Sequence, residues 1–216
     1  MYNVSFVPYN GDGNFLGYCN ITADNKFRLS SICVNRSEKS EDGFFLSMPA
    51  FSTGRKDDEG RPVYKDYYFP INKEFRRQLV EAVKKTMEIG EAVEICRDER
   101  TDFSIKVKRI SNKTDSSKDT GKRANVIVCL SRGLSGQNAD FVIDSYCIRE
   151  ALSGDKMGKL FISAPSKKDK SGNYGNLCFP ITKDFRSELY SRMMDAYDNE
   201  VIKAAAIEEK LSYEKV

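Results

Sequence analysis

Residues 69–79 read Phe-Pro-Ile-Asn-Lys-Glu-Phe-Arg-Arg-Gln-Leu, and residues 179–189 read Phe-Pro-Ile-Thr-Lys-Asp-Phe-Arg-Ser-Glu-Leu. Seven of these eleven positions are identical. The similarity continues upstream in two more pairs of segments, 27–34 with 141–148 and 44–49 with 160–165. The offset between aligned segments drifts only from about 110 to 116 residues, so the repeated unit is a whole domain and not a short solenoid unit.

The repeat indicates two domains, which the length of 216 residues also permits. We expect one domain over residues 1–95 (copy one) and a second over residues 96–216 (copy two), the latter with a helical C-terminal extension. Each copy is long enough to bury a core without disulfides or metals. The join around Gly90–Thr101 has few Gly, Pro or Ser residues, so it does not resemble a long flexible tether, and we expect the copies to pack together.

The absence of histidine from the whole chain removes several classes of enzyme. It excludes Ser-His and Cys-His nucleophilic pairs and most histidine general-base chemistry. Carboxylates or lysines could still catalyse, but no paired acidic motif appears in both copies. The six cysteines include no Cys-x-x-Cys pair, and without histidine they form no mixed zinc motif. We therefore expect a protein that is not an enzyme and holds no metal or cofactor.

Two cysteines, Cys33 and Cys147, hold equivalent repeat positions inside apolar segments. We expect both to be small core residues and not redox groups.

Nothing in the sequence indicates a membrane protein. No apolar run approaches the roughly 18 residues that cross a bilayer. The first residues, Met-Tyr-Asn-Val-Ser-Phe, lack the basic and apolar regions of a signal peptide. We expect no membrane partner and a cytoplasmic location.

Copy one is expected to form strands followed by one helix. The Asn10-Gly11-Asp12-Gly13 segment is typical of a hairpin turn. Asn72 is a good N-cap for a helix that begins at Lys73 and ends near Met87. The apolar stripe of this helix consists of Phe75, Leu79, Ala82, Val83 and Met87. The expected strands are Val4–Tyr9, Phe15–Thr22, Lys26–Asn35, Phe44–Met48 and Tyr64–Phe69, and the last two are expected to pair as a hairpin with an extended polar tip.

Copy two repeats this plan, with Thr182 as the helix cap. Its helical stripe consists of Phe185, Leu189, Met193 and Ala196. Arg192 falls near the stripe, where Ala82 stands in copy one, so it must extend to solvent or find a partner. The segment Val201–Leu211 is helical in character and either extends this helix or forms a separate one. The expected strands are Phe103–Ile110, Asn125–Leu130, Phe141–Arg149, Leu160–Ala164 and Gly175–Phe179, with loops inserted at Lys113–Arg123 and Ser131–Asn138.

The predicted fold class is therefore α+β. We expect two tandem copies of a small antiparallel β-sheet, each with a C-terminal α-helix packed on it.

The positive charge of the chain is concentrated in copy two. The net charge of the whole chain is only +3. Residues 1–98 are close to neutral, residues 99–194 carry a surplus of about seven positive charges, and the remaining residues are acidic on balance. A local basic surface of this size suits a polyanionic partner, although solvated surface charge explains most single lysines.

Copy two also carries a recognisable succession of motifs. Ala164-Pro165-Ser166-Lys167-Lys168 is followed by the turn Ser171-Gly172-Asn173 and then by Phe179-Pro180-Ile181-Thr182. This succession resembles the SpoVG family (stage V sporulation protein G, the septation-regulator family). In that family a Met-Pro-Ser-Lys-Arg-type hairpin, a Gly turn and His-Pro-Ile-(Asn/Thr) lead into a helix. Copy one keeps Ser47-Met48-Pro49 and Phe69-Pro70-Ile71-Asn72 but replaces the Ser-Lys-Arg segment with Ala50-Phe51-Ser52 and a longer loop.

The resemblance implies a compact α+β domain that acts in bacteria as a regulator that binds DNA and RNA. The expected partner is therefore DNA and/or RNA. Family members are short single-domain chains that resemble dimer formers, so we expect the two copies of this chain to pair within one molecule in place of a homodimer.

The residues themselves also indicate phosphate contacts at the hairpin tips and the helix starts. Lys and Arg side chains, with the free N–H groups of a helix start, contact phosphates and set affinity without reading sequence. The candidate nucleic-acid-binding residues are Lys167, Lys168, Lys170, Lys183 and Arg186 in copy two, and Arg55, Lys56, Lys73 and Arg77 in copy one.

A need for solubility alone is the alternative explanation of these charges. In copy two the two explanations are equally good. In copy one solubility is the better explanation, because Asp57, Asp58, Glu59 and Asp66 dilute the positive charge. We therefore expect copy two to be the main binder, through the tip that contains Lys167–Lys170.

Arg76 and Arg186 share one repeat position, directly after the stripe phenylalanine. The repetition favours a structural role, such as packing of the guanidinium against a sheet edge or pairing with a carboxylate.

A protein-interaction or assembly module is the competing functional hypothesis. Such a module would bind a protein partner through exposed strand edges or the acidic C-terminal helix, without nucleic acid.

Overall fold

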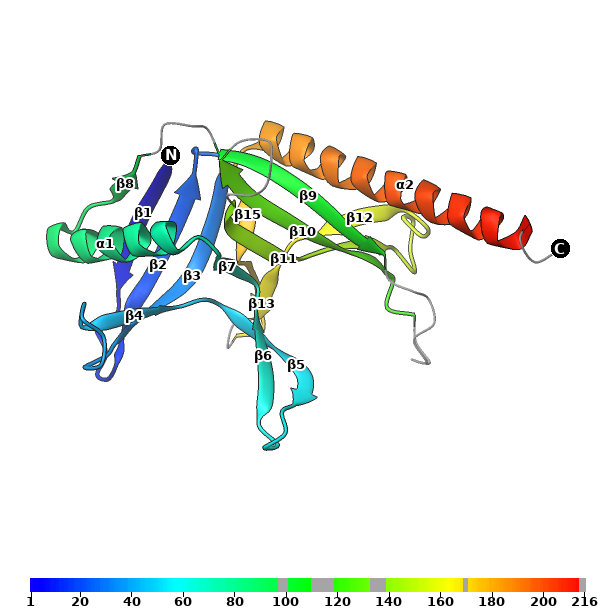
Figure 1. Cartoon of the computed structure of the whole chain (residues 1–216). Coiled ribbons are helices and arrows are strands. Elements are labelled where there is room, and N and C mark those ends of the chain that lie inside the picture. Colours follow the sequence, from blue (N-terminus) through cyan, green and yellow to red (C-terminus); the bar gives the residue numbers. More distant parts are fainter. Residues whose placement is uncertain (97–100, 110–118, 133–138, 169–170, 214–216) are drawn as a thin grey trace.

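The computed structural model describes residues 1–96, 101–109, 119–132, 139–168 and 171–213 (Figure 1). The elements of copy one are β1 (Tyr2–Pro8), β2 (Phe15–Ala23), β3 (Phe27–Arg36), β4 (Phe44–Ser47), β5 (Ala50–Lys56), β6 (Pro62–Asp66), β7 (Tyr68–Pro70), α1 (Lys73–Ile89) and β8 (Val93–Ile95). Those of copy two are β9 (Thr101–Arg109), β10 (Lys122–Arg132), β11 (Ala139–Glu150), β12 (Leu160–Ser163), β13 (Ser166–Lys168), β14 (Tyr174–Asn176), β15 (Cys178–Pro180) and α2 (Lys183–Tyr213).

Two antiparallel sheets form the body of the protein. The first has six strands in the order β15-β3-β2-β1-β8, with β4 also paired to β3. The second has five strands in the order β12-β11-β10-β9, with β7 also paired to β11. Two further hairpins, β5–β6 (hairpin one) and β13–β14 (hairpin two), stand apart from these sheets. The predicted α+β class is confirmed, with α1 following the strands of copy one and α2 those of copy two.

Each sheet contains one short strand from the other copy. Strand β7 of copy one pairs with β11, with Tyr68 opposite Ile143. Strand β15 of copy two pairs with β3, with Cys178 opposite Leu29. The exchange is reciprocal, because β7 and β15 contain the repeated Phe-Pro dipeptide and bind equivalent segments of β3 and β11. In Figure 1 the teal β7 lies beside the green β11, and the orange β15 lies beside the blue β3.

The hairpin expected between Phe44–Met48 and Tyr64–Phe69 is therefore wrong in its pairing. Strand β4 pairs with β3, where Cys33 is opposite Ser47. The intervening polar segment forms hairpin one together with the first residues of the expected strand Tyr64–Phe69, with Ser52 opposite Tyr64. The chain is then free to carry β7 across to the second sheet, which a direct β4–β7 pair would prevent.

A break in β3 marks the place where its partner changes. The first part of β3 pairs with β15, and the part from Cys33 onward pairs with β4. At the break Ser31 has a φ of 70°, and its N–H donates to the side-chain oxygen of Asn20. Ser30 donates through its N–H and its hydroxyl to the Leu177 carbonyl, at 2.8 and 3.0 Å. The break thus ties the end of hairpin two to the sheet of copy one.

The helices begin where the sequence predicts. The Asn72 side chain accepts hydrogen bonds from the N–H groups of Glu74 and Phe75, as an N-cap does. Helix α1 ends at Gly90, which has the left-handed φ of 73° that glycine adopts at low cost. The Thr182 hydroxyl accepts from the N–H of Phe185 and caps α2.

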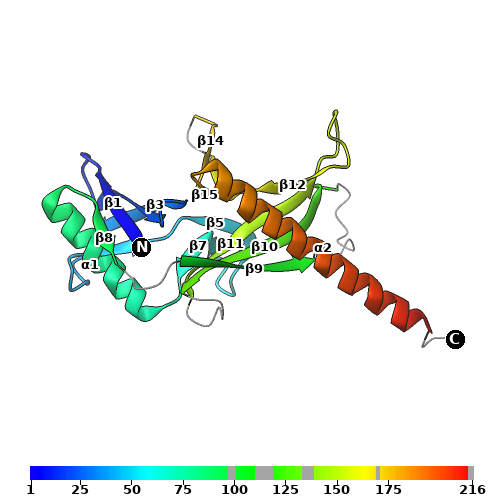
Figure 2. The same cartoon turned by 90° about the horizontal axis from the view of Figure 1, so that it is seen from above.

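The second helix is a single element of 31 residues, so the alanine-rich segment extends it. Its C-terminal part leaves the body of the protein in both views (Figures 1 and 2). Arg192, expected either to extend to solvent or to find a partner, donates from its guanidinium to the carbonyl of Phe103 and so joins α2 to β9.

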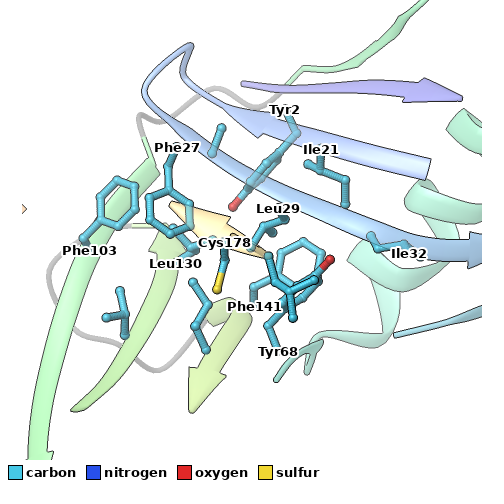
Figure 3. Close-up of a cluster of buried hydrophobic side chains, with 14 of the residues drawn as sticks. Tyr2, Ile21, Phe27, Leu29, Ile32, Tyr68, Phe103, Leu130, Phe141 and Cys178 are labelled. Carbon is cyan, nitrogen blue, oxygen red and sulfur yellow. The ribbon is translucent and has the colours of Figure 1, made fainter. Parts of the chain in front are cut away.

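One continuous hydrophobic core extends across both copies (Figure 3). Phe141 of copy two is fully buried, and its ring centroid lies 5.1 Å from that of Phe75, 6.2 Å from Tyr68 and 6.5 Å from Tyr2, all in copy one. The equivalent contact in the other direction joins Phe27 to Phe103 at 5.6 Å. Neither sheet completes its core without aromatic rings from the other copy.

The cysteines that lie in the core are not the pair expected from the sequence. Cys33 and Cys147 are only half-buried, whereas Cys19 and Cys178 lie in the core. Burial raises the pKa of Cys19 to about 12, so this thiol stays protonated at neutral pH.

Two kinds of feature are absent from the described residues. None of their helices combines the length and the apolar character needed to cross a membrane. None of their His, Cys, Asp and Glu side chains gather in a group of three or more that could hold a metal ion.

Candidate nucleic-acid interface

Both hairpins leave the seam where the two copies exchange strands. Hairpin one connects β4, in the first sheet, to β7, in the second. Hairpin two connects β12, in the second sheet, to β15, in the first. The hydroxyl of Tyr67, after hairpin one, donates to the carbonyl of Ser166, at the start of hairpin two, at 3.4 Å. The exchange of strands therefore brings together the ends of the two hairpins that join the sheets.

Hairpin two presents two exposed lysines. Lys167 and Lys168 are exposed, and within the described part of the chain no carboxylate pairs with either. Burial raises the pKa of Cys33 on β3, and the positive charge of Lys167 partly offsets this rise, which places Lys167 close to copy one. Lys168 places its Nζ 5.8 Å from the ring centroid of Tyr174. Lys170 lies outside the described residues.

Hairpin one is mixed in charge, as its sequence indicates. Arg61 pairs with Asp57 and with Glu59, at 2.8 Å in each case. The hydrogen bonds from Arg61 lower the pKa of Asp57, so this carboxylate keeps its negative charge near the tip. Arg55 and Lys56 are exposed and have no acidic partner in the part of the chain that is described.

Lys65 of hairpin one crosses to the other copy. Its Nζ lies 2.5 Å from Oδ2 of Asp144 on β11. This lysine therefore joins the two copies and is not available to an external phosphate.

The start of α1 is largely neutralised. Arg77 makes two ion pairs within the helix, to Glu74 and Glu81, each at 2.8 Å. These carboxylates also raise the pKa of Arg77. Lys73 is exposed in the first turn beside Glu74. Of the two α1 candidates, only Lys73 is free to contact a phosphate without first losing an intrahelical partner.

The start of α2 is more basic, because it gains a lysine from copy one. Lys183 and Arg186 are both exposed. Phe185 lies between these two residues in the sequence, and the Nζ of Lys26 is 5.9 Å from its ring centroid. The position equivalent to Lys26 in copy two is Asp140, which is buried and accepts a hydrogen bond from the Tyr2 hydroxyl. Sequence reasoning missed Lys26, since only the exchange of β15 brings it to α2.

Arg76 and Arg186 lie at equivalent places with different neighbours. Arg76 donates to the carbonyl of Pro70 at 3.2 Å, which fixes the end of β7 to α1 as a structural role requires. Arg186 lies near two tyrosines, Tyr146 and Tyr190. Burial raises the pKa values of both tyrosines, and the positive charge of Arg186 offsets part of that rise. Arg76 also lines a pocket of about 460 Å³ between β4, β7 and α1.

The structure thus separates the candidates into groups. Lys167 and Lys168 share hairpin two, and the short β15 connects this hairpin to the start of α2. Most of the candidate charge on copy one is paired, as in Arg77, or diluted, as in hairpin one, and Lys26 lies at the start of α2. The arrangement suits contact with the phosphates of a polyanion more on copy two than on copy one.

Comparison with known proteins gave one match. A family model described as SpoVG matches residues 1–88 and 137–199, which is more than half of the chain and includes parts of both copies. No curated protein and no solved structure matched.

Proposed function

The chain belongs to the SpoVG family, and on this premise we propose that it is a regulator that binds DNA or RNA and catalyses no reaction. It acts without a cofactor in the cytoplasm. The main phosphate-contacting surface consists of hairpin two and the start of α2, through Lys167, Lys168, Lys183, Arg186 and Lys26.

The exposed lysines of hairpin two, which pair with no carboxylate among the described residues, carry this proposal. Lys167 and Lys168 project from the seam between the copies. On copy one, Arg61 and Arg77 are bound to carboxylates, and Arg55 and Lys56 share hairpin one with acidic residues. Cations that already have a carboxylate partner gain less from a phosphate, because the partner must be given up first.

A salt titration of the whole chain tests the proposal. Labelled DNA and RNA of mixed sequence would be titrated with protein at several salt concentrations, and the dissociation constant read from fluorescence anisotropy. If five cations each neutralise one phosphate, log K should fall against log salt with a slope of about −4.5 on duplex DNA. Absence of binding at low salt, or a slope near zero, would contradict the proposal.

We also propose that strand exchange within one chain replaces a homodimer. The exchanged strands β7 and β15 already fill the edges of β3 and β11 that a second chain would otherwise occupy. Sedimentation at micromolar concentration should therefore give a monomer of 24.5 kDa. A stable dimer of the whole chain would argue against this substitution.

A protein-interaction module remains the second candidate, favoured by one observation. The C-terminal part of α2 extends beyond the sheets as an unbroken helix, which is the form in which helices enter grooves of protein partners (Figure 2). The same salt titration separates the two functions, since counterion release makes only nucleic-acid binding fall steeply with salt.

A further inference from the structure

Two exposed tyrosines occupy equivalent positions on the two hairpins. Tyr64 on β6 and Tyr174 on β14 are separated by the same 110 residues as Phe69 and Phe179. Tyr64 is 64% exposed and Tyr174 is 72% exposed. They are the two most exposed aromatic side chains in the part of the chain that the structure describes.

Single exposed aromatic residues are common on protein surfaces and need no explanation. This pair differs because the surrounding hairpins have diverged in length and charge. Hairpin one has a long mixed-charge tip and hairpin two a basic one, yet each keeps a tyrosine on its returning strand. The core does not require these rings, since neither is buried.

The neighbours of both rings leave them accessible, and those of Tyr174 also add positive charge. Tyr174 lies directly opposite Lys168, whose Nζ is 5.8 Å from the ring centroid. A cation over one face of an aromatic ring is attracted to it and also stays available to a phosphate. Tyr64 lies opposite the small side chain of Ser52. The space beside nearby Gly54 is open, since a Cβ added there would meet no atom within 4 Å.

We propose that Tyr174, and to a lesser extent Tyr64, stack on unpaired bases, so that the ligand of this protein is a single-stranded nucleic acid. The inference rests on the proposed function and specifies its ligand. Rings stack on bases of any identity, and the lysines of hairpin two hold the phosphates of the same strand. A duplex keeps its bases stacked on one another, so it offers these rings no free base face.

Binding by the full-length chain to three probes at one low salt concentration tests the inference. The probes are a single-stranded oligonucleotide of about 16 nucleotides, the duplex of the same length, and an abasic strand with the same phosphates. Tyr174→Leu should weaken binding to the single strand by about 5-fold to 150-fold, the range expected when one base loses its stacking partner. Tyr174→Phe keeps the ring and should retain the wild-type affinity. Affinity for the duplex and for the abasic strand should not change in either variant.

Matched variants separate this effect from a general loss of structure. Tyr64→Leu should weaken binding to the single strand less than Tyr174→Leu does, because hairpin one carries carboxylates near its tip. Tyr9→Leu removes another exposed tyrosine, one that packs on Phe15 between β1 and β2 and belongs to neither hairpin, and should leave all three affinities unchanged.

Two results would overturn the inference in different ways. If wild-type protein binds the abasic strand as tightly as the normal one, and Tyr174→Leu changes nothing, stacking is wrong while nucleic-acid binding stands. If wild-type protein binds none of the three probes, the proposed function fails and the inference fails with it.

Discussion

Replacing Phe141 with alanine should lower the free energy of unfolding by about 3–5 kcal/mol, the range for truncating a buried phenylalanine. The ring is fully buried on β11 and contacts Tyr2, Tyr68 and Phe75. All three partners belong to copy one, so the cavity would open in the part of the core that the copies share. Urea unfolding followed by circular dichroism and by tyrosine fluorescence measures this loss.

The two probes should report one coincident transition in both wild type and variant, because neither copy completes its core alone. Phe161→Ala removes a ring of the same size that is 47% exposed on β12, and should change the free energy of unfolding by no more than about 1 kcal/mol. Two separate transitions, of which only one responds to Phe141→Ala, would show that the copies unfold independently.

Local features of this fold could be predicted from sequence because neighbouring residues determine them. Asn72 caps α1 through contacts two and three residues away, and the spacing of Phe75, Leu79 and Val83 fixes the face that is buried. The exchange of β7 and β15 could not be predicted in this way. A short apolar strand before a helix can fill the edge of either sheet, and the choice depends on features such as the break in β3, which no sequence period reveals.

The same distinction between local and long-range features applies to the candidate site. The positive charge of the β13–β14 segment is local and was predicted. The ion pairs of Arg77 also have a local sequence signal, since Glu74 and Glu81 lie three and four residues away on the same helix face. The approach of Lys26 to α2 joins residues from different copies, so it follows from the exchange and has no local signal.

Reversing both described lysines of hairpin two, Lys167→Glu with Lys168→Glu, should produce the largest loss of nucleic-acid binding. At 50 mM salt each phosphate contact contributes roughly 15-fold through counterion release, so losing two should weaken binding roughly 200-fold. The slope of log K against log salt should become less steep by about 1.8 on duplex DNA. Anisotropy titrations of both proteins across the same salt series measure the two quantities.

The matched control reverses Lys156 and Lys159, which are exposed in the turn between β11 and β12. Both double variants change the formal net charge from +3 to −1, since each Lys→Glu replacement removes two charges. A loss of affinity confined to the hairpin variant places the phosphates at hairpin two, because the long-range effect of net charge is the same in both proteins. Equal losses in the two variants would contradict a defined contact at this hairpin, and an unchanged slope in the hairpin variant would remove Lys167 and Lys168 from the interface.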